Sequence, residues 1–217
     1  MKTQQFIYFP WQEAKCNIQK FNFYPDLILV FASRAMFANT PIIGMLKQAY
    51  PKAIITGCST SGEINGVNVN DNSLTATAVK FEKTKLKYNE VNIGDFKNSI
   101  DAGNHLVKAL VAEDLKHVFV LSEGLQVNGT ELVNGVRAGL PEGINTTGGL
   151  AGDGAAFEKT VVVSNSGKVE SGLITAIGFY GNDIQIGYGS LGGWDSFGIE
   201  RSVTKSEGNI LYEIDNL

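Results

Sequence analysis

The sequence predicts an α/β protein in which mixed β-sheets carry helices packed on their outer sides. Two continuous apolar runs of strand length, 26–33 and 117–124, indicate strands that are buried on both faces. An amphipathic helical segment follows each run, and segments of alternating apolar and polar residues follow each helix. Strands that alternate with helices are typical of α/β folds, and the alternating segments indicate antiparallel strands within the same sheets.

The same order of elements occurs twice, which predicts two related β-α-β-β-β units with an internal pseudo-two-fold symmetry. The halves cover about residues 24–95 and 116–194, and an amphipathic helix over 101–115 joins them. We therefore expect residues 1–217 to form a single domain built from two repeat-like halves.

In the first half, a helix over 41–50 follows the apolar strand. Thr40 supplies the N-cap of this helix, Pro41 occupies its first turn and Pro51 stops it. A strand, a hairpin around an Asn-Asp-Asn turn and a closing alternating strand come next. These segments are 53–57, the hairpin pair 67–69 and 73–81, and the closing strand 86–93.

In the second half, the helix over 129–140 begins at Asn128, because Glu131 lies three residues on in the spacing of a capping box. Pro141 ends this helix. A strand that ends in Thr-Gly, a hairpin around a Ser-Gly turn and a closing strand complete the half. These segments are 144–148, the hairpin pair 160–165 and 171–181, and the closing strand 183–191.

Composition and charge argue against several classes of protein. The chain has 217 residues, of which 43% are hydrophobic and 18% charged, and its formal net charge is −4. No run of Lys or Arg offers a surface for nucleic acid or an anionic membrane. The longest apolar runs are far shorter than the roughly 18 residues of a transmembrane helix, so we expect no membrane insertion. With two cysteines, Cys16 and Cys58, and no signal peptide, the sequence indicates a cytoplasmic protein with reduced thiols.

The predicted binding site lies where the apolar strands end. Ligands of open α/β sheets bind beyond the carboxyl ends of strands, and the segments 33–35, 58–63, 122–128 and 148–153 occupy such positions. They offer hydroxyls, carboxylates, amides and backbone N–H groups, which suit a small polar ligand. The residues expected to contact this ligand are Cys58, Ser59, Thr60, Glu63, Ser122, Glu123, Asn128, Gly148, Gly149, Asp153 and Trp194.

The turn TGCSTSGEI could also be a thiol site or a phosphate loop, but it lacks the residues that either needs. A nucleophilic Cys58 needs a base, and His105 and His117 fall in mid-helix and at the start of a strand. A Walker A loop needs Lys-Ser/Thr where Glu63-Ile64 stands. The turn has an echo, TGGLAGDG, in which Gly149 replaces the cysteine. We therefore interpret the two turns as paired walls of one pocket.

Three acids, Glu63, Glu123 and Asp153, can share this site. They are compatible with an acid–base pair or an oxygen-rich cation site. They are equally compatible with a helix cap, a solvent-facing acid and a partner for a ligand ammonium group. The sequence shows no metal-ligand spacing, so we expect neither a metal nor another cofactor.

The ordered set of motifs resembles the N-terminal FIST domain, a bacterial sensory domain family. The matching segments are DLILVFAS, GCSTSGEI, VFVLSEGLQVNG, GGLAGDG and FGIERSVTKSEGNILYEID, which together cover nearly the whole chain. Two positions depart from the family pattern. Glu123 stands where Asp is commoner, which affects the reach of the carboxylate, and Ile199 stands where Pro often follows Phe-Gly.

The resemblance implies a module for signal transduction that binds small molecules such as amino acids. It also implies a signalling output domain, or a FIST C-terminal domain, that follows this one in a longer chain. We expect a binding domain and not an enzyme. Two alternatives stay open, a thiol- or carboxylate-dependent hydrolase or transferase at the same cleft, and an interaction scaffold without a ligand.

Overall fold

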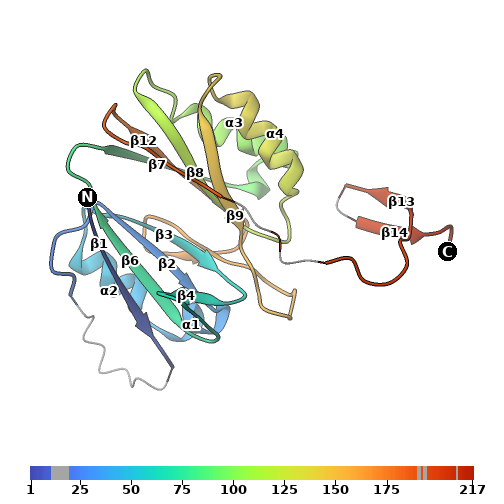
Figure 1. Cartoon of the computed structure of the whole chain (residues 1–217), viewed down its shortest axis with the longest axis horizontal. Helices are drawn as coiled ribbons and strands as arrows, with labels where there is room; N and C mark the ends of the chain where they lie inside the picture. The colour runs from blue at the N-terminus through green and yellow to red at the C-terminus, as the bar shows by residue number, and fades with distance from the viewer. Residues whose placement is uncertain (11–19, 190–191, 193–194, 209) are drawn as a thin grey trace. The chain divides into compact units, whose positions relative to one another are not determined.

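The computed structural model describes residues 1–10, 20–189, 192, 195–208 and 210–217. The chain forms two compact units, Met1–Ile184 and Gln185–Leu217, and each is described by itself. The first unit contains two large sheets with their helices, and the second contains one hairpin (Figure 1).

Six strands form the first sheet. Its central pair, β2 and β3, is parallel, and its other neighbouring pairs are antiparallel. In spatial order the strands are β1 (Lys2–Tyr8), β6 (Leu74–Lys80), β2 (Leu27–Ala32), β3 (Ile54–Ser59), β10 (Val162–Val163) and β11 (Val169–Glu170).

Four strands form the second sheet, in which β8 and β9 are parallel and the other neighbours are antiparallel. In spatial order they are β7 (Lys85–Asn92), β12 (Leu173–Tyr180), β8 (Leu115–Ser122) and β9 (Asn145–Leu150). The order β7-β12-β8-β9 repeats the order and directions of β1-β6-β2-β3 in the first sheet. This likeness supports a duplicated unit, while the pseudo-two-fold symmetry itself stays a prediction.

The first unit has four layers, with the two sheets inside and helices on both outer sides. The helices are α1 (Arg34–Asn39) and α2 (Ile42–Ala49) on the first sheet, and α3 (Ser99–Lys108) and α4 (Gly129–Gly139) on the second. Between the sheets lies a smaller apolar cluster that includes Leu121, Val162 and Leu173. The prediction of mixed sheets with helices packed outside is therefore confirmed (Figure 1).

Two small elements complete the first unit, and a hairpin forms the second. The strands β4 (Glu63–Asn65) and β5 (Asn68–Asn70) make a separate two-stranded sheet, and a 3₁₀ turn spans Ile93–Asp95. In the second unit β13 (Val203–Glu207) pairs antiparallel with β14 (Ile210–Ile214). No helix among the described residues is both long and apolar enough to cross a membrane.

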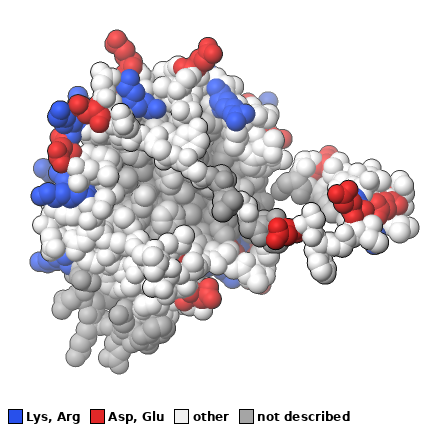
Figure 2. Space-filling model, viewed as in Figure 1, with Lys and Arg blue, Asp and Glu red and all other residues white. Residues whose placement is uncertain are grey.

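On the face of the first unit that Figure 2 shows, charged side chains of both signs lie near one another. Figure 2 shows Lys, Arg, Asp and Glu interspersed along the left and upper margins of this view. Among the described residues on this face, no broad area has one sign only. On this face, the interspersed charges therefore create no strong field of one sign.

The structure corrects the predicted strand pairings in the first half. The segment predicted to close this half, 86–93, forms β7 and pairs with β12 in the second sheet. The predicted hairpin between 67–69 and 73–81 does not form, because β5 turns back on β4 and β6 runs between β1 and β2. Alternation of apolar and polar residues indicates a strand and the face it buries, but not its partner.

The second half differs in the same way. Val162 and Val163 pair with 169–170 and with β3 of the first sheet, whereas 173–180 lies at the centre of the second sheet. The predicted closing strand 183–191 is not formed over 183–189, and 190–191 lie outside the described residues. Strand β1 and helix α1 were not predicted, since the edge strand β1 alternates weakly and α1 is only six residues long.

Two glycines at matching positions allow the parallel strands to approach closely. Gly57 lies opposite Val30 in the first sheet, and Gly148 lies opposite Val120 in the second. A Cβ atom at Gly57 would sit 1.7 Å from the Val30 carbonyl oxygen, and one at Gly148 would sit 1.8 Å from that of Val120. Both Thr-Gly motifs therefore serve the same backbone contact, as expected from their alignment.

The buried His117 side chain is held in its neutral form. It is 3% exposed, and its Nε2 atom lies 2.8 Å from Thr147 Oγ1 on β9. Burial lowers the pKa of His117 below its ordinary value of 6.5. The folded protein therefore binds a proton at His117 less readily than the unfolded chain does.

We predict that Gly148→Ala lowers the free energy of unfolding by more than about 2 kcal/mol, because the methyl group has no room beside Val120. The neighbouring Gly149 has no atom within 4 Å of a Cβ position, so Gly149→Ala is the matched control and should cost less than about 0.5 kcal/mol. Urea denaturation of both variants measures the difference. Equal effects of the two substitutions would contradict the close strand approach.

We also predict that stability falls as the pH drops below 6.5, where the unfolded chain takes up a proton at His117 more readily than the folded protein does. The slope from this one group cannot exceed about 1.4 kcal/mol per pH unit. In His117→Gln the slope between pH 6.5 and 5 should be smaller than in the wild type. Denaturation curves over this range measure both slopes, and identical slopes would refute the prediction.

Candidate functional site

The carboxyl ends of four strands, β2, β3, β8 and β9, meet at one place in the first unit. Short backbone hydrogen bonds join them pairwise. They run from Thr60 N to Ala32 O at 3.0 Å, from Gly152 N to Ser59 O at 2.8 Å and from Ala151 N to Ser122 O at 2.7 Å. We call residues 32–34, 59–63, 122–124 and 150–154 the strand-end junction. The structure thus brings together the four segments that the sequence places after its strands.

Glu123 is buried at the centre of this junction, with 1% of its surface exposed. Its Oε1 atom accepts hydrogen bonds from Leu125 N at 3.0 Å and Thr160 Oγ1 at 2.5 Å, and its Oε2 atom accepts one from Gln126 N at 2.6 Å. Thr160 Oγ1 in turn accepts from Gly124 N at 2.8 Å. A buried charge is tolerated only when it is paired or hydrogen-bonded, so this carboxylate fixes the loop after β8.

Glu63 has a similar role after β3. It is also 1% exposed, and it accepts from Thr60 Oγ1 at 2.7 Å, Ser73 N at 3.0 Å and Ser73 Oγ at 2.8 Å. These bonds hold the turn after β3 against the start of β6. The hydroxyl of Thr60, which the sequence assigns to the ligand, is therefore engaged with Glu63.

The most exposed charged group of the junction is Arg34, the first residue of α1, which Ser33 separates from β2. Its Nε atom lies 3.0 Å from Asp153 Oδ1, and its Nη2 atom lies 3.1 Å from Glu158 Oε2. The Asp153 side chain is buried and that of Arg34 is 35% exposed, whereas that of Glu158 is 70% exposed. This cluster links the end of the first β-α connection to the loop that follows β9.

Asp153 also binds the far end of the loop 153–159, of which it is the first residue. Its Oδ2 atom accepts hydrogen bonds from Glu158 N at 3.1 Å and Lys159 N at 2.9 Å. Burial alone would raise the pKa of Asp153, but the N–H groups of Lys159 and Glu158 and the guanidinium of Arg34 outweigh it. The pKa therefore lies below its ordinary value of 3.8, and the carboxylate is charged at neutral pH.

Cys58 lies inside the protein and not at the mouth of the junction. It is 4% exposed and packs between the sheets in the cluster with Leu121, Ala151, Val162 and Leu173. Burial raises the pKa of its thiol to about 12. Because the thiolate is the nucleophilic form, this environment weighs against the thiol-dependent alternative.

The two buried serines of the predicted site bond to backbone groups. Ser59 Oγ accepts from Val161 N at 3.0 Å, and Ser122 Oγ donates to Glu123 O at 2.9 Å. Every deeply buried side-chain nitrogen or oxygen in the described part of the chain has a hydrogen-bond partner. The hydroxyls that the sequence predicts as ligand contacts thus stabilise the strand ends in this structure.

Four further predicted residues lie at the margin of the junction or away from it. Asn128 caps α4 by accepting from Glu131 N at 3.1 Å. Gly148 and Gly149 lie within β9 and not in the turn after it. Trp194 lies outside the described residues.

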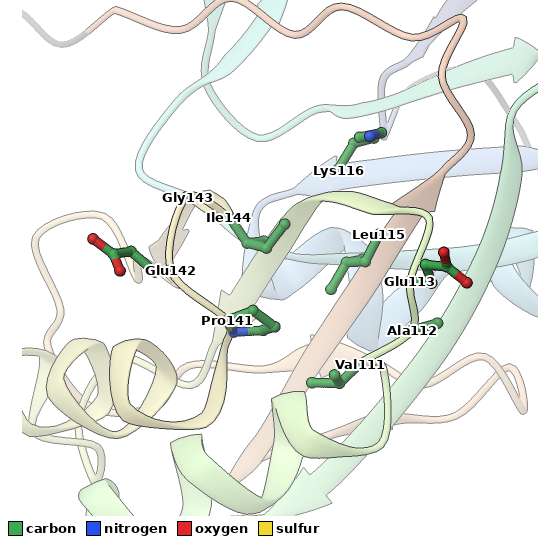
Figure 3. Close-up of a pocket in the computed structure, with 9 residues that line it drawn as sticks. All are labelled: Val111, Ala112, Glu113, Leu115, Lys116, Pro141, Glu142, Gly143 and Ile144. Carbon is green, nitrogen blue, oxygen red and sulfur yellow. The ribbon is translucent and has the colours of Figure 1, made fainter.

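A separate hollow of about 580 Å³ lies at the amino ends of β8 and β9, away from the strand-end junction. Figure 3 shows apolar side chains converging on it, while the carboxylates of Glu113 and Glu142 point away. Its lining comes from the loops before β8 and β9, and consists of Val111, Ala112, Glu113, Leu115, Lys116, Pro141, Glu142, Gly143 and Ile144. Its volume suits a small molecule, but it has few of the polar groups that fix a polar ligand in place.

Sequence reasoning missed the partners of the acidic residues. The ionic role of Arg34 could have been found, because a charged residue directly after a buried strand faces the same edge as Asp153. The contacts of Thr160 and Ser73 with the glutamates could not have been predicted from the sequence, since they depend on long-range strand pairing.

A family model described as FIST N domain matches residues 26–217 of this chain. The resemblance on which the sequence analysis relied is thus confirmed over most of the chain. A search of curated proteins gives no match.

We predict that Glu123→Gln lowers the free energy of unfolding by about 2 kcal/mol or more. The amide replaces one acceptor oxygen with a donor, which then faces a backbone or hydroxyl donor in a buried site. The control is Glu158→Gln, which makes the same chemical change at an exposed ion pair and should cost less than about 0.5 kcal/mol. Urea denaturation compares the two, and a Glu123→Gln variant as stable as the control would disprove the role of this carboxylate.

Proposed function

Because the chain belongs to the FIST N domain family, we propose that it binds a small polar ligand, of the amino-acid class, at the strand-end junction. Domains of this family are generally sensory domains in signal transduction. One observation supports this ligand class and this binding site. Arg34 and Asp153 present opposite charges side by side where four strand ends meet.

The exposed ion pair in this cluster can be exchanged for a ligand. Arg34 is held firmly on one side by the buried Asp153, but on the other side only by Glu158, whose side chain is 70% exposed. An exposed pair of this kind contributes about 0–1 kcal/mol. A ligand carboxylate therefore displaces Glu158 from the guanidinium at little cost, and it gains a charge-assisted hydrogen bond.

The released Glu158 then becomes available to the ligand ammonium group. Asp153 stays in place, since it also holds the N–H groups of Glu158 and Lys159. Glu63 and Glu123 are less suited to this task, because each already accepts three hydrogen bonds from the protein. Their part is to fix the loops between which the ligand lies.

We further propose that binding proceeds without chemical turnover. Burial raises the pKa of the Cys58 thiol, which disfavours the nucleophilic thiolate. Glu63 and Glu123 each accept three hydrogen bonds from the protein, so neither carboxylate is free to act as an acid or base on a ligand. We propose that ligand binding changes the activity of a signalling output domain, or the state of a FIST C-terminal domain, in the same bacterial, cytoplasmic protein. That part of the proposal relies on the sensory character of the family.

A panel of amino acids tests the proposal by thermal shift and calorimetry. A ligand at 100 times its dissociation constant should stabilise the protein by about 2.7 kcal/mol. Arg34→Gln should weaken binding at least about tenfold, because the ligand carboxylate loses its cationic partner. Arg137→Gln, on the exposed face of α4, removes the same charge elsewhere and should leave the affinity unchanged.

Two results would count against this site. The first is a panel in which no compound raises the unfolding midpoint. The second is a ligand that binds wild type, Arg34→Gln and Arg137→Gln equally, with all three proteins folded to the same extent before the ligand is added.

A further inference from the structure

Among the described residues, no strand pairs with the outer edge of strand β9 in the second sheet. It lies at the end of the order β7-β12-β8-β9, and five of its six residues are exposed. At the matching place in the first sheet, β3 is covered by β10, with Cys58 opposite Val162 and Gly57 opposite Val163. The protein therefore shows, in its own first sheet, that an edge of this type accepts an antiparallel strand.

The composition of β9 makes this edge unusual among the outer strands of both sheets. Natural proteins protect open edges with charges, prolines or very short strands. The outer strands β1 and β7 carry Lys2 and the pair Lys85 and Lys87, and β11 is two residues long. Strand β9 has the sequence NTTGGL, which is six residues long with no charge and no proline.

The free hydrogen-bonding groups of β9 can be assigned. Ala151 N donates to Ser122 O on β8, and successive residues of a strand point their N–H groups to opposite sides. The N–H and C=O groups of residues 146, 148 and 150 therefore lie on the open edge. These groups form a ladder that an antiparallel strand can complete.

Apolar side chains lie next to this ladder. Leu150 is 47% exposed, and its side chain lies over Gly129 at the start of α4. Val133, which is 48% exposed, is one helical turn further along the same face of α4. A partner that pairs with β9 can therefore also bury apolar surface beside it.

We propose that this edge is the dimer interface of the protein, where β9 pairs antiparallel with β9 of a second copy. The strand is uncharged from end to end, so two identical strands meet without like-charge repulsion. The contact continues an existing sheet, because it joins two four-stranded sheets into one of eight strands. A two-fold pairing of this kind is closed, since it uses the β9 edge of both copies. The outer strands of the joined sheet are then the two β7 strands, whose lysines Lys85 and Lys87 discourage further pairing.

One register of the pair uses the outward groups of all three residues. Residues that face each other across an antiparallel pair have side chains on the same face of the sheet. With the outward groups on 146, 148 and 150, the two-fold axis passes beside Gly148. Residue 146 then faces 150 of the partner, and Leu150 of each copy packs beside Thr146 of the other.

Sedimentation velocity over a range of protein concentrations tests the proposal. The wild type should form a dimer, and Thr146→Lys should weaken the dimer at least about tenfold, because it places a charge on the edge. Thr146→Pro removes an outward N–H group and should weaken the dimer as well. Asn68→Lys, on the exposed β5, adds the same charge to a different sheet and should not change dimerisation.

Hydrogen exchange supplies a second measurement that does not depend on the variants. The amides of 146, 148 and 150 should be protected in the dimer and become exposed on dilution. Three results would overturn the proposal. They are a monomer at every concentration, a dimer that survives both substitutions at Thr146, and protection of these amides in the monomer.

Discussion

A buried carboxylate needs hydrogen-bond donors from the protein in place of water. Glu123 accepts three such bonds, from Leu125 N and Gln126 N in the loop that follows β8 and from Thr160 Oγ1 beside it. One of these partners, Thr160, lies two residues before β10, the strand that joins the first sheet. The buried charge therefore fixes the loop and the crossing connection together. Glu63 does the same for the turn after β3. With both turns held in this way, Arg34 and Asp153 can meet at the strand-end junction.

The elements that depend on local pattern could be predicted from the sequence. The apolar strands, the helices α2 and α4, the Asn128 cap of α4 and the echo of Gly57 in Gly148 are all local signals, and they occur in the structure. The predicted N-cap of α2 does not occur, because α2 follows Pro41 without a side-chain cap hydrogen bond, and Thr40 instead ends α1, where its Oγ1 atom donates to Met36 O. Partners of alternating strands could not be predicted. Strand β7 closes the first half along the chain but lies in the second sheet, and β10 belongs to the second half but lies in the first. Nothing in a short stretch of sequence specifies such exchanges, since period-two alternation sets only the face that is buried.

The location of the candidate site could be predicted from the sequence, but the hydrogen bonds that its residues make could not. Strand ends in an α/β fold converge, so the four segments could be expected to meet. Yet Ser59, Thr60, Glu63, Ser122 and Glu123 use their polar atoms within the protein. A sequence pattern tells which polar groups reach a junction, whereas only the contacts tell which of them are already satisfied. The exposed contact between Arg34 and Glu158 is the one that we propose a ligand exchanges.

The central claim is that the strand-end junction, and not the apolar hollow at the other end of the second sheet, receives the ligand. A residue-resolved NMR titration with the amino acid that binds most tightly tests it directly. The account predicts that the largest amide shifts occur at 32–34, 59–63, 122–124 and 150–160. Shifts confined to 111–116 and 141–144, which line the hollow, would contradict it.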